Sequence, residues 1–299
     1  MNPKKLSKES TVGVIAPSRP IYTRKGEFKR GLKILKDFGF NIKLGKNINK
    51  HDYYSAGTSI ERAYDLSRMF ADKKVNTIIC ATGGITSNQI INLIDYKLVK
   101  NNPKTFIGYS DNTNLLLSIF KKTGLTTYYG PDVCEIGNLS DEALKKYEGF
   151  LRTGATNIST KFNTIKAGKG KGKLIGGTLF SICGLLATQY LPKLDNAILF
   201  WEDTGESPAK IDFLLNQLKL STKLENLSAM IIGHLDDCTD KKYPQDNKPI
   251  EEIVKTVFQK YNFPIIKVEN FGHEIKNSEI IPIGMNCEID TKNNRFKLV

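Results

Sequence analysis

The hydrophobic positions in the first half of the chain alternate between short apolar runs and helical repeats. Apolar, β-branched runs at residues 11–17, 75–81 and 105–108 predict strands, and the run at 75–81 is continuous enough for a central parallel strand. Residues 25–38 and 60–70 instead repeat apolar side chains at helical spacing. Repeated strand–helix units of this length predict an α/β domain with a doubly wound parallel sheet. Shorter patterns add strands at 41–44 and 126–129, a helix through 90–94 and a helix ending near 124.

The pattern breaks over residues 153–173, which are rich in Gly, Thr and Lys and poor in large apolar side chains. We therefore expect an N-terminal domain over 1–155, a linker over 156–173 and a smaller C-terminal α/β domain over 174–299. The latter begins with an expected helix over 179–191. Further helices are expected after Ser207-Pro208 and over 250–261, and strands at 197–201, 229–232, 264–268, 280–283, 288–290 and 295–299.

Length and composition are those of an ordinary globular protein. The 299 residues can bury the cores of two domains, and 40% hydrophobic with 25% charged residues is a common balance. No apolar run approaches the roughly 20 residues of a membrane span. The apolar run after the basic N-terminus is too short for a signal peptide. We expect a cytoplasmic protein with no membrane partner.

The net charge of +13 raises the hypothesis of a nucleic-acid partner. The alternative is a lysine-rich composition, because the lysines are scattered over predicted helix faces and cluster only at 166–173. No nucleic-acid-binding motif accompanies the charge, so we expect no such partner.

Metal and cofactor patterns are missing from the sequence. The five cysteines are widely spaced without a Cys-x-x-Cys pair, which indicates reduced thiols, and only three histidines accompany them. Neither a Gly-x-Gly-x-x-Gly fingerprint nor a phosphate-binding P-loop occurs. We expect neither metal nor cofactor.

Polar residues follow several predicted strands, where the reactive groups of parallel α/β sheets collect. A serine, two carboxylates and two imidazoles that follow strands, where a cleft would form, are the components of a Ser/His/acid hydrolase. From the residues alone the choice of acid and base stays open, and each group has a structural alternative, such as a tight turn or a hydrogen-bonded structural histidine. His51 is expected on a surface loop. The candidates are Gly83-Gly84, Ser110, Glu202-Asp203, His234 and His273.

Ser110 lies where a strand turns sharply into a helix, so its hydroxyl would project from the sheet near the positive end of the helix. Gly108 supplies the small residue two places before it. Asn112 stands where a nucleophile elbow commonly has glycine. An ordinary Ser-Asp helix cap explains the same residues equally well.

Taken in order, short blocks of the chain resemble the family of serine carboxypeptidases that includes LD-carboxypeptidase and the microcin C self-immunity protein. The blocks are residues 14–18 (Val-Ile-Ala-Pro-Ser), 81–84 (Ala-Thr-Gly-Gly), 108–111 (Gly-Tyr-Ser-Asp), 129–131 (Tyr-Gly-Pro), 176–179 (Gly-Gly-Thr-Leu), 201–206 (Trp-Glu-Asp-Thr-Gly-Glu), 271–273 (Phe-Gly-His) and 282–284 (Pro-Ile-Gly). The resemblance implies a nucleophile Ser110, an acid Glu202 and a base His273. The resemblance also accounts for Asn112 in place of a second glycine, because the family's elbow is of the Gly-x-Ser-Asp type. The backbone N–H groups of Gly84 and Asp111 are the oxyanion donors that we expect.

The family resemblance further implies a homodimer and a small peptide or peptidyl-nucleotide substrate. Murein peptides cleaved before a terminal D-Ala are the first expectation. Residues 83–88 and 102–110 look closer to the microcin-immunity branch, which cleaves an aminoacyl-nucleotide amide. The single tryptophan, Trp201, is expected in the core and not on a nucleobase. A catalytically silent binding protein on the same plan stays as an alternative.

Overall fold

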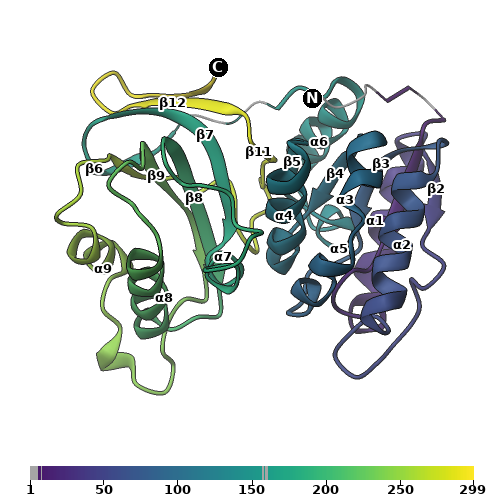
Figure 1. Ribbon diagram of the computed structural model, residues 1–299, viewed down its shortest axis with the longest axis horizontal. Coiled ribbons are helices and arrows are strands. Elements are labelled where there is room, and N and C mark those ends of the chain that lie inside the picture. The colour runs from purple at the N-terminus through teal and green to yellow at the C-terminus, as the bar shows by residue number, and fades with distance from the viewer. Residues whose placement is uncertain (1–5, 8, 157, 159–160) are drawn as a thin grey trace. The chain divides into compact units, whose positions relative to one another are not determined.

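The computed structural model describes residues 6–7, 9–156, 158 and 161–299. The chain divides into two compact units. The first unit comprises Met1–Asn157 and Lys276–Gly284, and the second comprises Ile158–Ile275 and Met285–Val299. Each unit has a sheet of its own (Figure 1).

A six-stranded sheet organises the first unit, with the strand order β11-β5-β4-β3-β1-β2. All neighbouring strands are parallel except β11, which is antiparallel to β5. This is the predicted doubly wound arrangement, and the predicted fold class is confirmed. The strands are β1 (Thr11–Ile15), β2 (Asn41–Leu44), β3 (Val75–Cys80), β4 (Thr105–Gly108), β5 (Thr127–Tyr129) and β11 (Ile281–Ile283).

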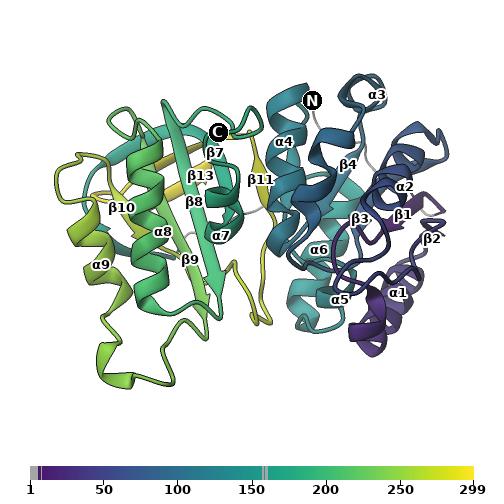
Figure 2. The ribbon, with the colours of Figure 1, turned by 60° about the horizontal axis from the view of Figure 1, so that its bottom comes forward.

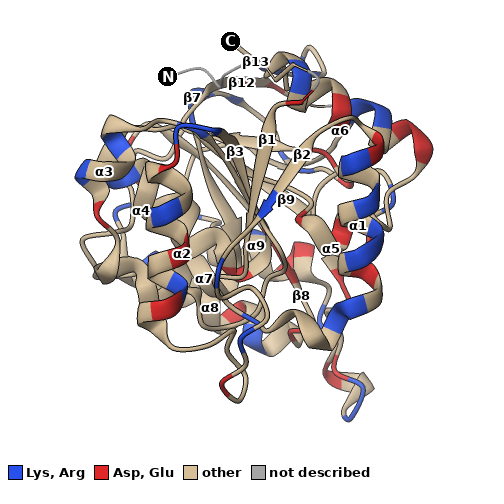
Figure 3. Cartoon of the chain, turned by 90° about the vertical axis from the view of Figure 1, so that its right-hand side faces the viewer, with Lys and Arg blue, Asp and Glu red and all other residues tan. Residues whose placement is uncertain are grey.

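Helices cover both faces of this sheet, with α1, α5 and α6 on one face and α2, α3 and α4 on the other (Figure 3). Each amphipathic pattern turns its apolar stripe to the strands, as in α2, where Leu66, Met69 and Phe70 are buried. A capping box between Thr58 and Glu61 starts α2. The helices are α1 (Lys25–Asp37), α2 (Ser59–Ala71), α3 (Tyr96–Asn101), α4 (Thr113–Thr123), α5 (Val133–Ile136) and α6 (Asp141–Thr153).

The second unit has a seven-stranded mixed sheet with the order β13-β12-β7-β8-β9-β10-β6. Its centre, β7 to β10, is parallel, whereas β6, β12 and β13 are antiparallel to their neighbours. Helix α8 lies between α7 and α9 (Figure 2). The elements are β6 (Asn163–Lys166), β7 (Lys169–Thr178), α7 (Leu179–Gly184), β8 (Ala197–Thr204), α8 (Pro208–Ser221), β9 (Ala229–Asp236), α9 (Ile250–Val257), β10 (Ile265–Lys267), β12 (Asn286–Asp290) and β13 (Arg295–Leu298).

The segment predicted as a linker, 156–173, contains β6 and the first half of β7, so this part of the prediction is wrong. Lysines 169, 171 and 173 are exposed, while Gly170 and Gly172 alternate with them. A Cβ on Gly170 would collide with the Ser228 carbonyl oxygen, and one on Gly172 with that of Asn196. The Gly/Lys run is thus a period-two strand whose inner positions exclude a side chain.

Three other expectations are corrected. Residues 276–284 belong to the first unit and not to a continuous C-terminal domain, because β11 pairs with β5. The helix expected over 179–191 ends at Gly184, and the helix expected through 90–94 is a 3-10 helix, Ser87–Leu93.

Candidate active site

Ser110 occupies a strained turn between β4 and α4. Its backbone φ is +57°, in the left-handed region that non-glycine residues rarely adopt, and the preceding Tyr109 is extended. A short 3-10 turn, Ser110–Asn112, then leads directly into α4. A left-handed residue between a strand and a helix is the backbone geometry that a nucleophile elbow requires.

Glycine is required where the loop after β3 meets this turn. A Cβ on Gly83 would lie 2.6 Å from the Ser110 Cβ and 3.1 Å from its Oγ. A Cβ on Gly84 would collide with the Ser18 Oγ. Close backbone approach is therefore a stronger explanation of the Gly83-Gly84 pair than a free-standing tight turn.

Asn112 has a structural role of its own. A Cβ on Gly108 would lie only 2.9 Å from the Asn112 Cβ, so Asn112 packs closely on Gly108. The Asn112 side-chain amide donates a hydrogen bond of 3.1 Å to the Thr82 carbonyl oxygen. Asn112 therefore links the loops that follow β3 and β4, and a second glycine is not needed at this position.

Asp111 is buried immediately after Ser110, with 3% of its surface exposed. Its carboxylate accepts hydrogen bonds from the Ser18 hydroxyl at 2.6 Å and from the Ser87 backbone N–H at 3.0 Å. Burial raises the pKa of Asp111, and these two hydrogen bonds act against that shift. The side chain is thus a fixed anchor under the turn.

In the second unit, Glu202 and His273 form a hydrogen-bonded pair. The His273 Nδ1 lies 2.7 Å from the Glu202 Oε2, which also accepts from the His273 backbone N–H at 3.2 Å. The other carboxylate oxygen accepts from the Thr178 hydroxyl at 2.8 Å. Glu202 has no exposed surface and the His273 side chain only 15%. A buried carboxylate that orients an imidazole is the arrangement that the acid–base half of a catalytic triad requires.

Sheet pairing explains how Glu202 comes to be there. The strand was expected to end at residue 201, but β8 continues to Thr204, so Glu202 lies within the strand. Thr178, the last residue of β7, is its partner in the parallel ladder. The pairing of β8 with β9 is irregular at Glu202, as often happens where a sheet aims a functional side chain.

Asp203, the alternative acid, has different partners. Its carboxylate accepts from the backbone N–H groups of Phe180 at 2.9 Å and Thr204 at 3.0 Å. Burial, reinforced by the neighbouring charge of Glu202, raises the pKa of Asp203 to about 7. Glu202 is thus the carboxylate that contacts His273, whereas Asp203 accepts hydrogen bonds from backbone N–H groups.

His234 and His51 have partners of other kinds. The His234 Nδ1 lies 2.9 Å from Glu269, and both side chains are substantially exposed. The His51 ring meets the edge of Tyr22 with ring centroids 4.7 Å apart. An exposed ion pair of this sort contributes little energy and provides no buried base.

Sequence reasoning gave no role to Thr178, Ser18 or Arg62. Thr178 and Ser18 lie inside two of the blocks that carry the family resemblance, which was the available signal. Arg62 interrupts the apolar face predicted for α2, and a charge on a buried face was also a signal.

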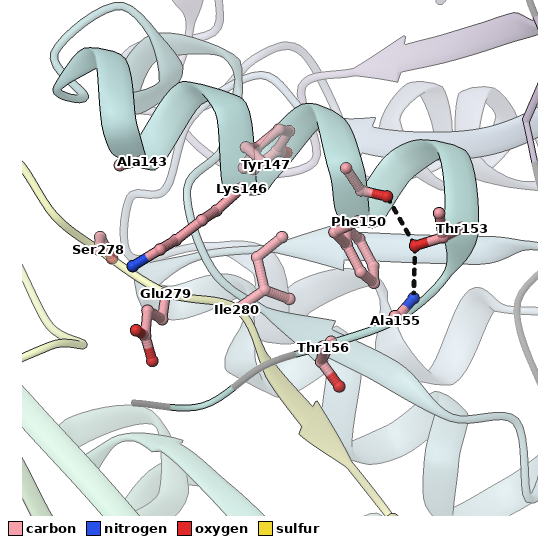
Figure 4. Close-up of a pocket in the computed structure, with 11 residues that line it drawn as sticks. Ala143, Lys146, Tyr147, Phe150, Thr153, Ala155, Thr156, Ser278, Glu279 and Ile280 are labelled. Atoms are coloured by element: carbon pink, nitrogen blue, oxygen red, sulfur yellow. Dashed lines mark hydrogen bonds between the residues drawn. The ribbon is translucent and has the colours of Figure 1, made fainter. Parts of the chain in front are cut away.

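A cavity of about 190 Å³ in the first unit contains none of the predicted site residues. Ala143, Tyr147 and Phe150 of α6 form one wall, and Ser278 with Ile280 forms another (Figure 4). Among the residues that the structure describes, no group of three or more His, Cys, Asp or Glu side chains could hold a metal ion. No helix in the described part of the chain is long and apolar enough to cross a membrane.

Two family models match the chain. The LD-carboxypeptidase N-terminal domain matches residues 12–130, and the LD-carboxypeptidase C-terminal domain matches residues 171–289. The chain belongs to the LD-carboxypeptidase family. It is accordingly a serine carboxypeptidase, an enzyme and not a silent binding protein.

Relatives within the LD-carboxypeptidase family cover nearly the whole chain. The chain is 33% identical to the probable murein peptide carboxypeptidase of Bacillus subtilis, over 97% of this chain and 91% of that protein. It is 30% identical to the microcin C7 self-immunity protein MccF of Escherichia coli, over 98% and 94% respectively. The solved structure of MccF in complex with glutamyl sulfamoyl guanosine matches with a TM-score of 0.89 at 26% identity, covering 100% of this chain and 98% of that one.

Proposed function

We propose that the chain hydrolyses an amide bond next to a terminal carboxylate through a triad of Ser110, Glu202 and His273. The observation that carries this proposal is the buried Glu202–His273 pair, in which Nδ1 lies 2.7 Å from a carboxylate oxygen. A carboxylate only accepts hydrogen bonds, so Nδ1 carries the proton and Nε2 keeps a lone pair for catalysis. Ser110, on its strained turn in the first unit, is the nucleophile that this base serves.

In the proposed reaction the Ser110 Oγ attacks the carbonyl carbon while His273 Nε2 takes its proton. The Glu202 carboxylate stabilises the imidazolium, and backbone N–H groups of Gly84 and Asp111 donate to the oxyanion. The imidazolium then protonates the leaving amine, and the C–N bond breaks. Water, deprotonated by the same imidazole, hydrolyses the acyl-enzyme and frees Ser110.

The substrate we propose is a murein tetrapeptide from which the terminal D-Ala is released. Support comes from the 33% identity to the probable murein peptide carboxypeptidase of Bacillus subtilis. A second candidate is the amide of an aminoacyl nucleotide, supported by the similarity to MccF, one structure of which contains glutamyl sulfamoyl guanosine.

One experiment tests both the mechanism and the substrate. The purified protein and its Ser110→Ala variant are incubated separately with a murein tetrapeptide and with a glutamyl sulfamoyl nucleoside, and the products are followed by mass spectrometry. We expect the wild type to release D-Ala from the tetrapeptide and the variant to release none, with an unchanged circular dichroism spectrum. Full activity of Ser110→Ala would contradict the serine mechanism.

We further propose a homodimer that works in the cytoplasm. The five cysteines all lie in the described residues and are free thiols, which is consistent with a reducing compartment. Light scattering after gel filtration measures the mass, for which the dimer expectation is twice the 33.5 kDa of the chain.

A further inference from the structure

A buried polar network lies beneath the Ser110 turn in the first unit. Its members are Arg62 of α2, Ser18 after β1, Thr86 and Ser87 after β3, and Asp111 after β4, and none is more than 5% exposed. The network therefore joins the three loops at the carboxyl ends of neighbouring parallel strands.

Ser18 is the central link of this network. Its hydroxyl donates to the Asp111 Oδ2 at 2.6 Å and accepts from the Thr86 backbone N–H at 3.0 Å. The Gly84 backbone packs so closely on the Ser18 hydroxyl that a Cβ on Gly84 would collide with it. One hydroxyl thus contacts the loop of each proposed oxyanion donor.

Arg62 and Ser87 make further hydrogen bonds to the same loops. The Arg62 Nη1 donates to the Pro17 carbonyl oxygen at 2.7 Å and to that of Thr86 at 2.9 Å. The Ser87 backbone N–H donates to the Asp111 Oδ2 at 3.0 Å, and its hydroxyl donates to the Asp111 carbonyl oxygen at 2.5 Å.

Apolar residues would fill this space at a lower desolvation cost, because a buried guanidinium and a buried carboxylate both lose strong hydration. Polar groups instead fix directions and distances, since each hydrogen bond tolerates little change in length or angle. Such precision matters where two N–H groups must converge on one developing charge.

We infer that Ser18 and the Asp111 carboxylate are positioning residues that set the distance between the Gly84 and Asp111 backbone N–H groups of the oxyanion hole. The inference rests on the proposed function, because it assumes that Ser110 is the nucleophile. Ser18 has no exposed surface and Asp111 only 3%, so both act from beneath the site and not on the substrate directly. Their effect is on turnover, through the geometry of the two donors.

The contacts of Asp111 allow geometry to be separated from charge. Both hydrogen bonds go to Oδ2, and Oδ1 has no hydrogen-bond partner among the described residues. In Asp111→Asn the amide oxygen can keep both hydrogen bonds while the amide nitrogen replaces Oδ1. Asp111→Ala removes them. Ser118→Ala is the matched control, because its buried hydroxyl donates only to the Leu115 carbonyl oxygen of its own helix.

The experiment measures kcat, KM and the rate at which a serine-directed phosphonate labels Ser110, together with urea unfolding, for each variant. We expect Ser18→Ala and Asp111→Ala to lower kcat and the labelling rate by about 10- to 100-fold with KM changed less than about threefold, the range that a displacement of about 1 Å can cause. Asp111→Asn should stay within about fivefold of wild type, since it keeps the geometry. Ser118→Ala should keep the wild-type kcat.

A Ser18→Ala protein that folds and matches Ser118→Ala in kcat and labelling would overturn the inference. So would an Asp111→Asn as impaired as Asp111→Ala, because charge and not geometry would then be responsible. If Asp111→Ala does not fold, Ser18→Ala and Asp111→Asn still decide the question. Ser110→Ala, run beside them, keeps the two ideas apart: its activity would refute the serine mechanism itself.

Discussion

Replacing Glu202 by glutamine tests how the His273 imidazole is oriented. The Glu202 Oε2 faces two groups of His273, the ring Nδ1 at 2.7 Å and the backbone N–H at 3.2 Å. A backbone N–H only donates, so the glutamine NH2 cannot take the Oε2 position. It must take the Oε1 position, 2.8 Å from the Thr178 hydroxyl, which can accept. The glutamine oxygen then still holds Nδ1–H, and the imidazole keeps its tautomer.

The variant therefore loses the negative charge and not the orientation. A hydrogen bond to a charged group exceeds a neutral one by about 1–2 kcal/mol, which sets the smaller estimate. Two unit charges about 4 Å apart at an effective dielectric constant of about 20 attract by about 4 kcal/mol, which sets the larger. At about 1.4 kcal/mol per decade of rate, kcat should fall by about 10- to 1000-fold.

Steady-state kinetics of Glu202→Gln measure this loss, with Glu269→Gln as the matched control. Glu269 makes the same kind of contact with His234 at 2.9 Å, but on the surface, and its removal should leave kcat unchanged. A loss of about 10⁴-fold, the size associated with a wrong tautomer, would refute the argument from the His273 backbone N–H. An unchanged kcat in Glu202→Gln would show that the carboxylate charge is not used.

Three further predictions concern other parts of the chain. His234→Ala should keep kcat within about twofold of wild type, because an exposed ion pair contributes little. A loss of kcat as large as that of His273→Ala would show that the base was chosen wrongly. Burial raises the pKa of Asp203 to about 7, so the folded protein binds the carboxyl proton more tightly than the unfolded chain does. The stability that this bound proton contributes is therefore lost as pH rises from about 4 to 7. Asp203→Asn does not titrate, so its free energy of unfolding relative to wild type should rise by on the order of 4 kcal/mol over that interval in urea titrations, and a flat difference would contradict the assigned burial. Gly149→Ala in α6 should stabilise the fold by about 0.5–1 kcal/mol, because a Cβ there meets nothing within 4 Å. Gly31→Ala in α1 should destabilise it by about 1–3 kcal/mol, because the added Cβ collides with the Val133 carbonyl oxygen. Equal shifts of the melting temperature in the two variants would refute this contrast.

Periodicity was most informative where an element is amphipathic and its spacing is regular. The helix predicted over 25–38 is found at Lys25–Asp37, and the strand predicted over 105–108 is found there unchanged. Periodicity failed to predict the strand over residues 169–173, because glycine occupies the inner positions and the composition resembles that of a linker. The reason lies outside the segment, in carbonyl oxygens of distant residues that leave no room for a Cβ.

The candidate site divides in the same way. Placing Ser110, Glu202 and His273 near strand ends needed only local patterns. The left-handed backbone that distinguishes the turn at Ser110 from an ordinary helix cap came only from the structure. The local pattern did not distinguish Glu202 from Asp203, or His273 from His234. That choice depends on contacts between residues far apart in sequence, such as Glu202 and His273, which are 71 positions apart.

By itself the sequence determined the strand and helix periods and the supply of polar groups near strand ends, because these depend on residues within a few positions of one another. The tertiary structure decided that Glu202 holds His273 while Asp203 holds backbone N–H groups. It also decided that β11 pairs with β5 in the first unit. Such outcomes depend on which strands become neighbours in a sheet, and that order is set by the packing of the whole chain and not by any local spacing.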